Sequence, residues 1–272
     1  MAIRNVQSAE RQTGALPSYT IRRSARARGI RVTVDPIRGV LVTVPPQTRR
    51  GWARPEAEIE RFLRERSAWL DRHLTRHARQ RAAIESRGGL ADGSLFRYRG
   101  GLHRLRIDET ARRRTRRSAV RVAPGAIVDE LVVEIASGDR RSVRAVLEAW
   151  LRDEAGRQIL ESVATHAPAL GVTPAAISFR DPRSRWGSAS RRDRLSFSWR
   201  LVLAPPEALD TVVVHELAHL RVFGHPPAFW ALVASRRPDH LVWRRWLQDH
   251  SLELHAALEP PSRREPVERA SA

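Results

Sequence analysis

The sequence of 272 residues contains no cysteine and no lysine, and its only methionine is Met1. The absence of cysteine excludes disulfide bonds, cysteine-ligated metal sites and thiol redox centres. No apolar run approaches the length of a membrane span, and residues 1–18 lack the apolar core of a secretory signal peptide. We therefore expect a cytoplasmic protein with no membrane partner.

Because lysine is absent, all 49 basic residues are arginine, and they outnumber the 30 acidic residues to give a formal net charge of +19. Such an excess is compatible with affinity for nucleic acid, although a solvated charged surface needs no partner. The arginines concentrate in residues 22–31, 112–117 and 180–194. The last group precedes the motif described next, so attraction of acidic substrate or nucleic acid and a merely solvated surface both remain open for it.

One short motif has the residues typical of a catalytic metal centre. His215-Glu216-Leu217-Ala218-His219 follows an apolar stretch, and Pro206 with Glu207 is typical of the first turn of a helix. Two histidines four residues apart project from one face of a helix, so both can bind one zinc ion. Glu216 between them can then act on a metal-bound water.

A third histidine follows at a suitable distance to complete the ligand set. His225 stands six residues after His219, where Gly224 and Pro226-Pro227 predict that the helix has ended. Three protein ligands leave the fourth position open for water, which is the arrangement of catalytic zinc. A residue further along the chain is the alternative third ligand, and the candidates are Asp239, Glu253 and His240.

The segments around the motif resemble a known family. The chain is similar to the YgjP-like metallopeptidases, bacterial zincin-type proteins related to the SprT-like group. The resemblance is dense from about residue 178 to residue 246 and looser over the amino-terminal strands. It rests on a Trp-Gly-Ser segment, the His-Glu-x-x-His motif and a His-x-x-x-Phe-Trp segment, which occur in the family's order as residues 186–188, 215–219 and 225–230.

The resemblance implies a specific ligand set and reaction. It implies a zinc ion bound by His215, His219 and His225, with Glu216 as the general base for hydrolysis of peptide bonds. The family usually has cysteine after Trp-Gly-Ser, whereas this chain has Ala189. We therefore expect no thiol role at this place, while the zinc ligands are unaffected by the difference.

Metzincin proteases share the spacing of the three histidines. They also require a glycine where this chain has Val222, and a methionine turn downstream of the motif. Since the only methionine is Met1, the sequence argues against a true metzincin.

The residue pattern along the chain predicts an α+β protein, and the resemblance implies that it contains a zincin-like metallopeptidase domain. Alternating residues predict short strands over 19–44, 96–107 and 120–135. Helical periodicity predicts helices over about 55–77, 142–166 and 239–254, besides the motif helix and one that starts at Phe229. We divide the chain into a disordered amino terminus (1–17), a β-rich portion with one helix (18–140), the metallopeptidase domain (141–256) and a disordered tail (257–272).

Some residues near the motif are candidates for further roles. Arg183 and Arg185 are candidates for stabilising an oxyanion, whereas Trp186 and Trp199 are expected to pack in the core against the motif helix. The apolar segment Leu195–Leu203 is typical of a strand. An extended strand beside a zincin helix often receives substrate as an added strand, so this segment is a candidate for binding the substrate backbone.

Three functions fit the sequence. The first is a zinc-dependent endopeptidase acting on a peptide or protein substrate. The second is a SprT-like protease acting on proteins held on nucleic acid, which the positive charge favours, although no separate DNA-binding module is recognisable. The third is a non-catalytic protein that binds zinc or nucleic acid. Glu216 argues against the third function, because a structural zinc site needs no general base.

Overall fold

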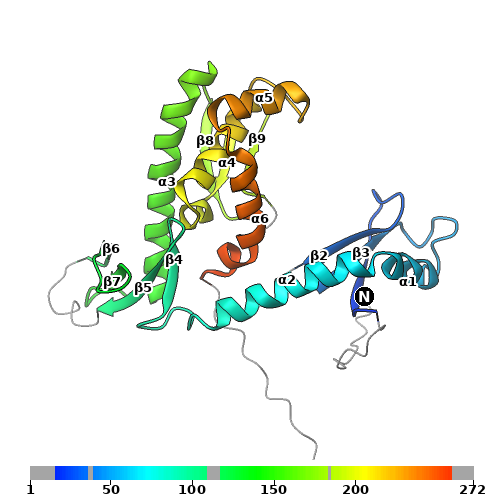
Figure 1. Cartoon of the computed structure of the whole chain (residues 1–272), viewed down its shortest axis with the longest axis horizontal. Coiled ribbons are helices and arrows are strands. Elements are labelled where there is room, and N and C mark those ends of the chain that lie inside the picture. Colours follow the sequence, from blue (N-terminus) through cyan, green and yellow to red (C-terminus); the bar gives the residue numbers. More distant parts are fainter. Residues whose placement is uncertain (1–15, 36–38, 109–116, 183–184, 259–272) are drawn as a thin grey trace, which may run out of the picture. The chain divides into compact units, whose positions relative to one another are not determined.

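A computed structural model of the chain describes residues 16–35, 39–108, 117–182 and 185–258 (Figure 1). The chain forms two compact units, Met1–Ala82 and Ala83–Ala272. This division differs from the predicted start of the metallopeptidase domain at residue 141, and where the catalytic portion begins stays a prediction. Of the ends predicted to be disordered, residues 1–15 and 259–272 lie outside the described residues.

The first unit is a small sheet with helices. Strand β3 (Gly39–Val44) lies between β1 (Tyr19–Arg23), to which it is parallel, and β2 (Arg31–Asp35), to which it is antiparallel. Two helices follow, α1 (Glu56–Glu65) and α2 (Ser67–Glu85). Apolar residues of β3 and of both helices form one buried cluster: Val40, Val42, Val44, Ile59, Leu63 and Leu70.

The single helix predicted over residues 55–77 is two helices joined at Arg66. Arg66 has φ −111° and ψ 16°. Its N–H donates to the carbonyl of Leu63 at 3.2 Å, three residues back, as in a 3-10 turn. Arg66 is neither glycine nor proline, so no residue type in this stretch marks the break.

The second unit contains two further sheets. The larger has the strand order β4-β5-β7-β6, with β5 and β7 parallel and the other pairs antiparallel. Its strands are β4 (Leu95–Tyr98), β5 (Gly101–Asp108), β6 (Ala119–Ala123) and β7 (Glu130–Glu134). The smaller has the order β8-β10-β9, with β10 parallel to β8 and antiparallel to β9. Its strands are β8 (Ala176–Arg180), β9 (Gly187–Ala189) and β10 (Arg194–Ser198).

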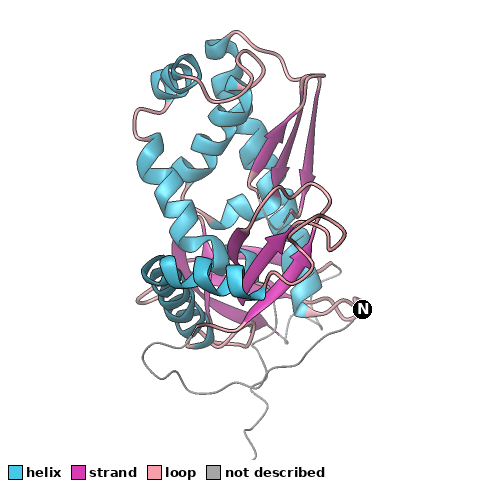
Figure 2. Ribbon diagram, turned by 90° about the vertical axis from the view of Figure 1, so that its right-hand side faces the viewer, coloured by secondary structure: helices cyan, strands magenta, loops and turns pink. Residues whose placement is uncertain are grey.

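Among its described residues, the second unit also contains four α-helices and a 3-10 helix. Figure 2 shows the helices and strands of the chain in separate colours. Helix α4 packs against α3, α5 and α6. Together with the strands, these helices make the mixed α+β architecture that the sequence predicts. Their bounds are α3 (Val143–Leu170), η2 (Trp199–Leu203), α4 (Pro206–Ala218), α5 (Pro227–Arg236) and α6 (His240–Ala256). Among the described residues, no helix combines the length and the apolar composition needed to cross a membrane.

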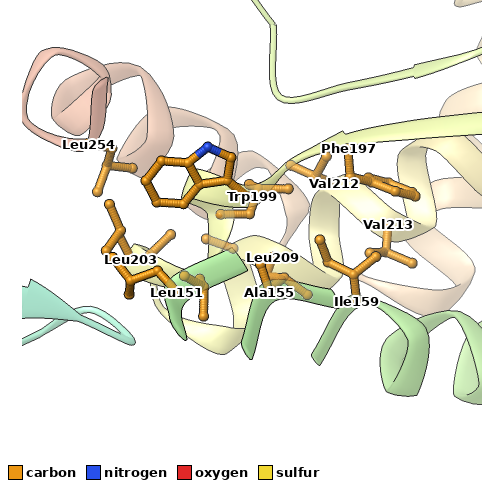
Figure 3. Close-up of a cluster of buried hydrophobic side chains, with 14 of the residues drawn as sticks. Leu151, Ala155, Ile159, Phe197, Trp199, Leu203, Leu209, Val212, Val213 and Leu254 are labelled. Atoms are coloured by element: carbon orange, nitrogen blue, oxygen red, sulfur yellow. The ribbon is translucent and has the colours of Figure 1, made fainter. Parts of the chain in front are cut away.

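A continuous hydrophobic core holds α4 in place. Figure 3 shows Trp199 of η2 among apolar side chains of α3, α4 and α6. Trp199 is fully buried, and so are Leu151 of α3 and Val213 of α4. Apolar side chains of this size each contribute roughly 1.5–3 kcal/mol when buried, so the core fixes the position of the helix that carries the motif.

The segment Leu195–Leu203 differs from its prediction. It forms the end of β10 and then the 3-10 helix η2, not one strand. Strand β10 is hydrogen-bonded to β8 on one side and to β9 on the other, so it has no free edge for an added strand. All five residues of η2 are buried. The prediction that this segment receives the substrate backbone is therefore wrong.

We expect Trp199→Ala to lower the free energy of unfolding by about 3–5 kcal/mol, because it leaves a large cavity in the core. Leu241 on α6 is 64% exposed, and Leu241→Ala should change this free energy by less than about 0.5 kcal/mol. Denaturant unfolding followed by circular dichroism measures both. Equal stability of the two variants would show that Trp199 is not an anchor of this core.

Candidate metal centre

The side chains of His215, His219 and His225 converge. One ring nitrogen of each lies within 4.8 Å of the others, and Nε2 of His225 is 3.2 Å from Nε2 of His215. Two nitrogens bound at about 2.0–2.1 Å to one tetrahedral zinc ion lie about 3.3 Å apart. The observed distance therefore fits two ligands of one metal ion, and the donor set suits the imidazole preference of zinc.

The end of α4 sets the orientation of His219. The helix stops at Ala218, and His219 is its C-cap residue, several residues before the end that the sequence predicts near Gly224. Nδ1 of His219 lies 3.3 Å from the carbonyl oxygen of Val222. Because a carbonyl can only accept, Nδ1 carries the proton and donates, and the lone pair is left on Nε2. This is the second contact that metal-binding histidines usually make.

A glycine turn brings His225 back towards α4. Gly224 has φ 79°, in the left-handed region that favours glycine. Pro226, next after His225, is extended with ψ 170° and precedes the first turn of α5. The loop between the two helices therefore reverses direction close to the motif, as the Gly224 and Pro226-Pro227 pattern predicts.

Aromatic residues of α5 pack against the three imidazole rings. The ring of Phe229 is fully buried, and its centroid lies 4.9 Å from His215, 4.4 Å from His219 and 4.8 Å from His225. Trp230 stacks on His225 with 5.4 Å between centroids. These contacts restrict the rings to the orientations in which their nitrogens converge.

The surroundings of His215 and His219 favour the neutral form of the ring, which binds metal. Burial, together with the neighbouring His219 and His225, lowers the pKa of His215 to about 3. Burial also lowers the pKa of His219. Neutral imidazole offers a nitrogen lone pair, whereas the protonated ring offers none.

Glu216 lies against strand β9. The residue is 6% exposed, and burial raises the pKa of its carboxyl to about 7, although the positive charge of Arg185 opposes the rise. A Cβ atom on Gly187 would lie 2.6 Å from both Cγ and Oε1 of Glu216. Only glycine at position 187 leaves room for the Glu216 side chain in this position.

The alternative third ligands lie outside the converging group of described residues. Asp239 accepts a hydrogen bond from the Trp243 indole N–H at 2.6 Å. Glu253 is engaged in ion pairs with two arginines. His240 stacks on Trp230 with 5.5 Å between centroids. The geometry thus favours His225 over all three as the third metal ligand.

The other residues singled out in the sequence have different positions. Trp199 is buried in the core, and Trp186 is half-buried and packs against the same core, as predicted. The ring of Trp186 also stacks on His255 with 4.7 Å between centroids. Arg183 lies outside the described residues, and Arg185 is exposed.

Two features of the site have no signal in the sequence pattern. The Val222 carbonyl belongs to the backbone, so its contact with His219 does not depend on the type of residue 222. Arg244 lies over the Trp230 ring, with 4.4 Å from Cζ to the centroid, and approaches the site from α6. Gly187 is different, because it belongs to the Trp-Gly-Ser segment, but only the structure reveals its contact with Glu216.

Comparison with known proteins identifies a family to which the chain is similar. A family model described as "YgjP-like, metallopeptidase domain" matches residues 28–250. Comparisons with curated proteins and with solved structures give no match. The matched range covers most of the chain and contains the three converging histidines and Glu216.

Proposed function

The chain belongs to the YgjP-like metallopeptidase family, and we propose that it hydrolyses peptide bonds with a zinc ion held by His215, His219 and His225 and with Glu216 as the general base. Membership of the family makes the chain a metallopeptidase acting on a peptide or protein. The zinc ion, the ligand set, the role of Glu216 and the zincin-type arrangement are our proposal.

One observation carries the proposal: nitrogens of three imidazole rings converge next to the buried carboxyl group of Glu216. Three nitrogen ligands and one open position are typical of catalytic zinc, whereas a structural zinc site usually has four protein ligands. When bound, the metal ion supplies a Lewis acid that polarises the scissile carbonyl and lowers the pKa of water.

Glu216 is suited to proton transfer. A general base works best when its pKa lies near the working pH, and burial brings the pKa of this carboxyl to about 7. In the proposed reaction, Glu216 accepts a proton from the attacking water and passes it to the leaving amine. Gly187 leaves room for the Glu216 carboxylate in this position, because a side chain at residue 187 would displace the carboxylate.

Strand β9 is suited to hold the substrate. In the described part of the chain it is the edge strand of its sheet, with β10 on one side only. An extended peptide that pairs with the free edge would gain main-chain hydrogen bonds. Because Gly187 of β9 lies beside Glu216, such a peptide would pass close to the general base. We propose β9 in place of the segment Leu195–Leu203 as the substrate strand.

Metal removal tests the proposed function. We expect chelator-treated protein to lose cleavage of a denatured proteome and to regain it when zinc is added back, because the proposed reaction needs the Lewis acid. Labelling of new amino termini measures the cleavage. The same set of new termini from treated and untreated protein, with metal removal verified by elemental analysis, would contradict the proposal.

A further inference from the structure

Three arginines from separate segments act on or contact residues in the histidine cluster or next to it in the sequence. Arg185 precedes Gly187 by two residues, and its charge acts on the Glu216 carboxyl. Arg191, in the turn between β9 and β10, lies over the ring of Phe223 at 5.5 Å. Phe223 itself follows Val222, whose carbonyl contacts His219. The first two arginines thus come from the two ends of the strand that we propose as the substrate strand.

The third arginine comes from α6. Arg244 lies over the ring of Trp230 at 4.4 Å, and Trp230 stacks on His225. Its charge also acts on His215. Stacking on an aromatic ring holds a guanidinium group in place while its N–H donors stay free for a ligand. Arg191 and Arg244 share this arrangement.

These three charges are not neutralised within the described part of the chain. None of the three guanidinium groups forms an ion pair with a carboxylate there. Elsewhere in the same unit, arginines do have acidic partners: Arg200 pairs with Asp181 at 2.6 Å, and Arg157 pairs with Glu154 at 2.8 Å. Unpaired cations around a site raise the local concentration of anionic ligands and steer their approach.

We propose that the site selects polypeptide segments with aspartate or glutamate close to the scissile bond, and that Arg185, Arg191 and Arg244 bind these carboxylates. This inference rests on the proposed peptidase function and names its substrate class. Guanidinium groups bind carboxylates through paired, charge-assisted hydrogen bonds. In an extended peptide, successive side chains point to opposite faces of the strand, so arginines from different segments around β9 can contact different side chains of one bound peptide.

Nucleic acid is the other anionic polymer that such arginines attract. The arrangement favours peptide, because the three arginines border a site that contains a general base and lies beside a free strand edge. Recognition of a duplex would instead be expected to use a continuous basic stripe. We therefore expect these arginines to contribute to peptide binding and not to duplex binding.

Peptide binding by an inactivated protein tests the inference without relying on catalysis. The probes are fluorescent peptides of one extended sequence whose alternate positions are all glutamate, all glutamine or all lysine. Fluorescence anisotropy measures their Kd for zinc-loaded Glu216→Gln protein. We expect the glutamate peptide to bind about tenfold more tightly than the glutamine peptide, and the difference to shrink in high salt.

Added substitutions assign the preference to particular arginines. We expect Arg191→Gln and Arg244→Gln each to lower the ratio of glutamate-peptide to glutamine-peptide affinity about threefold, as for other solvent-exposed ion pairs. Their neighbours provide matched controls. Arg192→Gln and Arg245→Gln remove the same charge one residue away and should leave this ratio within about 1.5-fold.

Two results would overturn the inference. One is equal Kd values for the three peptides. The other is an affinity ratio that Arg191→Gln and Arg244→Gln change no more than their controls Arg192→Gln and Arg245→Gln do. Loss of binding to a DNA duplex in Arg191→Gln and Arg244→Gln, with the peptide ratio unchanged, would overturn it in favour of nucleic acid. Proteome cleavage by the wild-type protein separates this failure from that of the proposed function. Cleavage of the proteome without selectivity among the three peptides would overturn this inference alone. No cleavage of the proteome would contradict the proposed peptidase function.

Discussion

Replacing His219 by alanine is expected to lower zinc affinity by more than about 100-fold. Removal of a group that merely orients a metal ligand already costs 10–100-fold in affinity, and this substitution removes a ligand itself. Only two of the three converging nitrogens remain in the variant. The hydrogen bond to the Val222 carbonyl, which fixes the ring, is lost as well.

Competition with a chromophoric chelator measures this affinity. His250→Ala is the control, because His250 stacks on Trp246 and is not part of the converging group. This control should bind zinc as the wild-type protein does. Circular dichroism of both variants separates loss of a ligand from loss of the fold. Wild-type affinity in a folded His219→Ala protein would show that the metal is held elsewhere.

Replacing Gly187 by alanine is expected to lower kcat by about 100-fold while zinc stays bound. The added methyl group would lie 2.6 Å from Cγ and Oε1 of Glu216, closer than atoms in van der Waals contact. The carboxylate must therefore move, and a displaced general base loses much of the 10²–10⁴-fold acceleration that such groups contribute. The three atoms nearest to this methyl group all belong to Glu216, so we expect metal binding to be retained.

Gly138→Ala is the matched control for this substitution. A Cβ atom at residue 138 meets nothing within 4 Å, so the same chemical change should leave both kcat and zinc content as in the wild-type protein. Steady-state kinetics and elemental analysis measure the two quantities. If Gly187→Ala retained wild-type kcat, the close approach of Glu216 to β9 would have no part in catalysis. If it lost zinc, its effect would lie in metal binding instead.

Helix α3 shows what local sequence determines. Ser142 is its N-cap, where the side chain accepts from the Ala145 N–H at 3.2 Å, and Gly171 ends it with φ 64°. Both residue types are standard helix signals. The helix nevertheless runs beyond the predicted end at His166 and includes Pro168. A proline this close to the end removes one hydrogen bond but does not prevent a final turn.

Long-range contacts account for the predictions that were wrong. Leu195–Leu203 is apolar throughout, and an apolar run does not distinguish a buried strand from a buried helical turn. Packing on the core, not periodicity, makes its second half a 3-10 helix. For the same reason the sequence does not show which strand has a free edge, because strand order depends on pairing between residues distant in sequence.

Local sequence predicts some features of the candidate site, whereas others depend on contacts between residues distant in sequence. His215 and His219 are four residues apart on one turn, so the motif alone predicts that they share a face. The glycine and prolines around His225 predict a turn, and the converging geometry agrees with it. The approach of Glu216 to Gly187 joins α4 to a strand nearly thirty residues earlier. No local pattern predicts a contact of that kind.

The kcat of Glu216→Gln tests the central claim most directly. Glutamine has nearly the size of glutamate but does not accept a proton at neutral pH. With zinc content equal to wild type, and with a peptide taken from the cleaved proteome as substrate, the account predicts a fall in kcat of about 10²–10⁴-fold. A fully zinc-loaded Glu216→Gln protein that cleaves this peptide at the wild-type rate would contradict it.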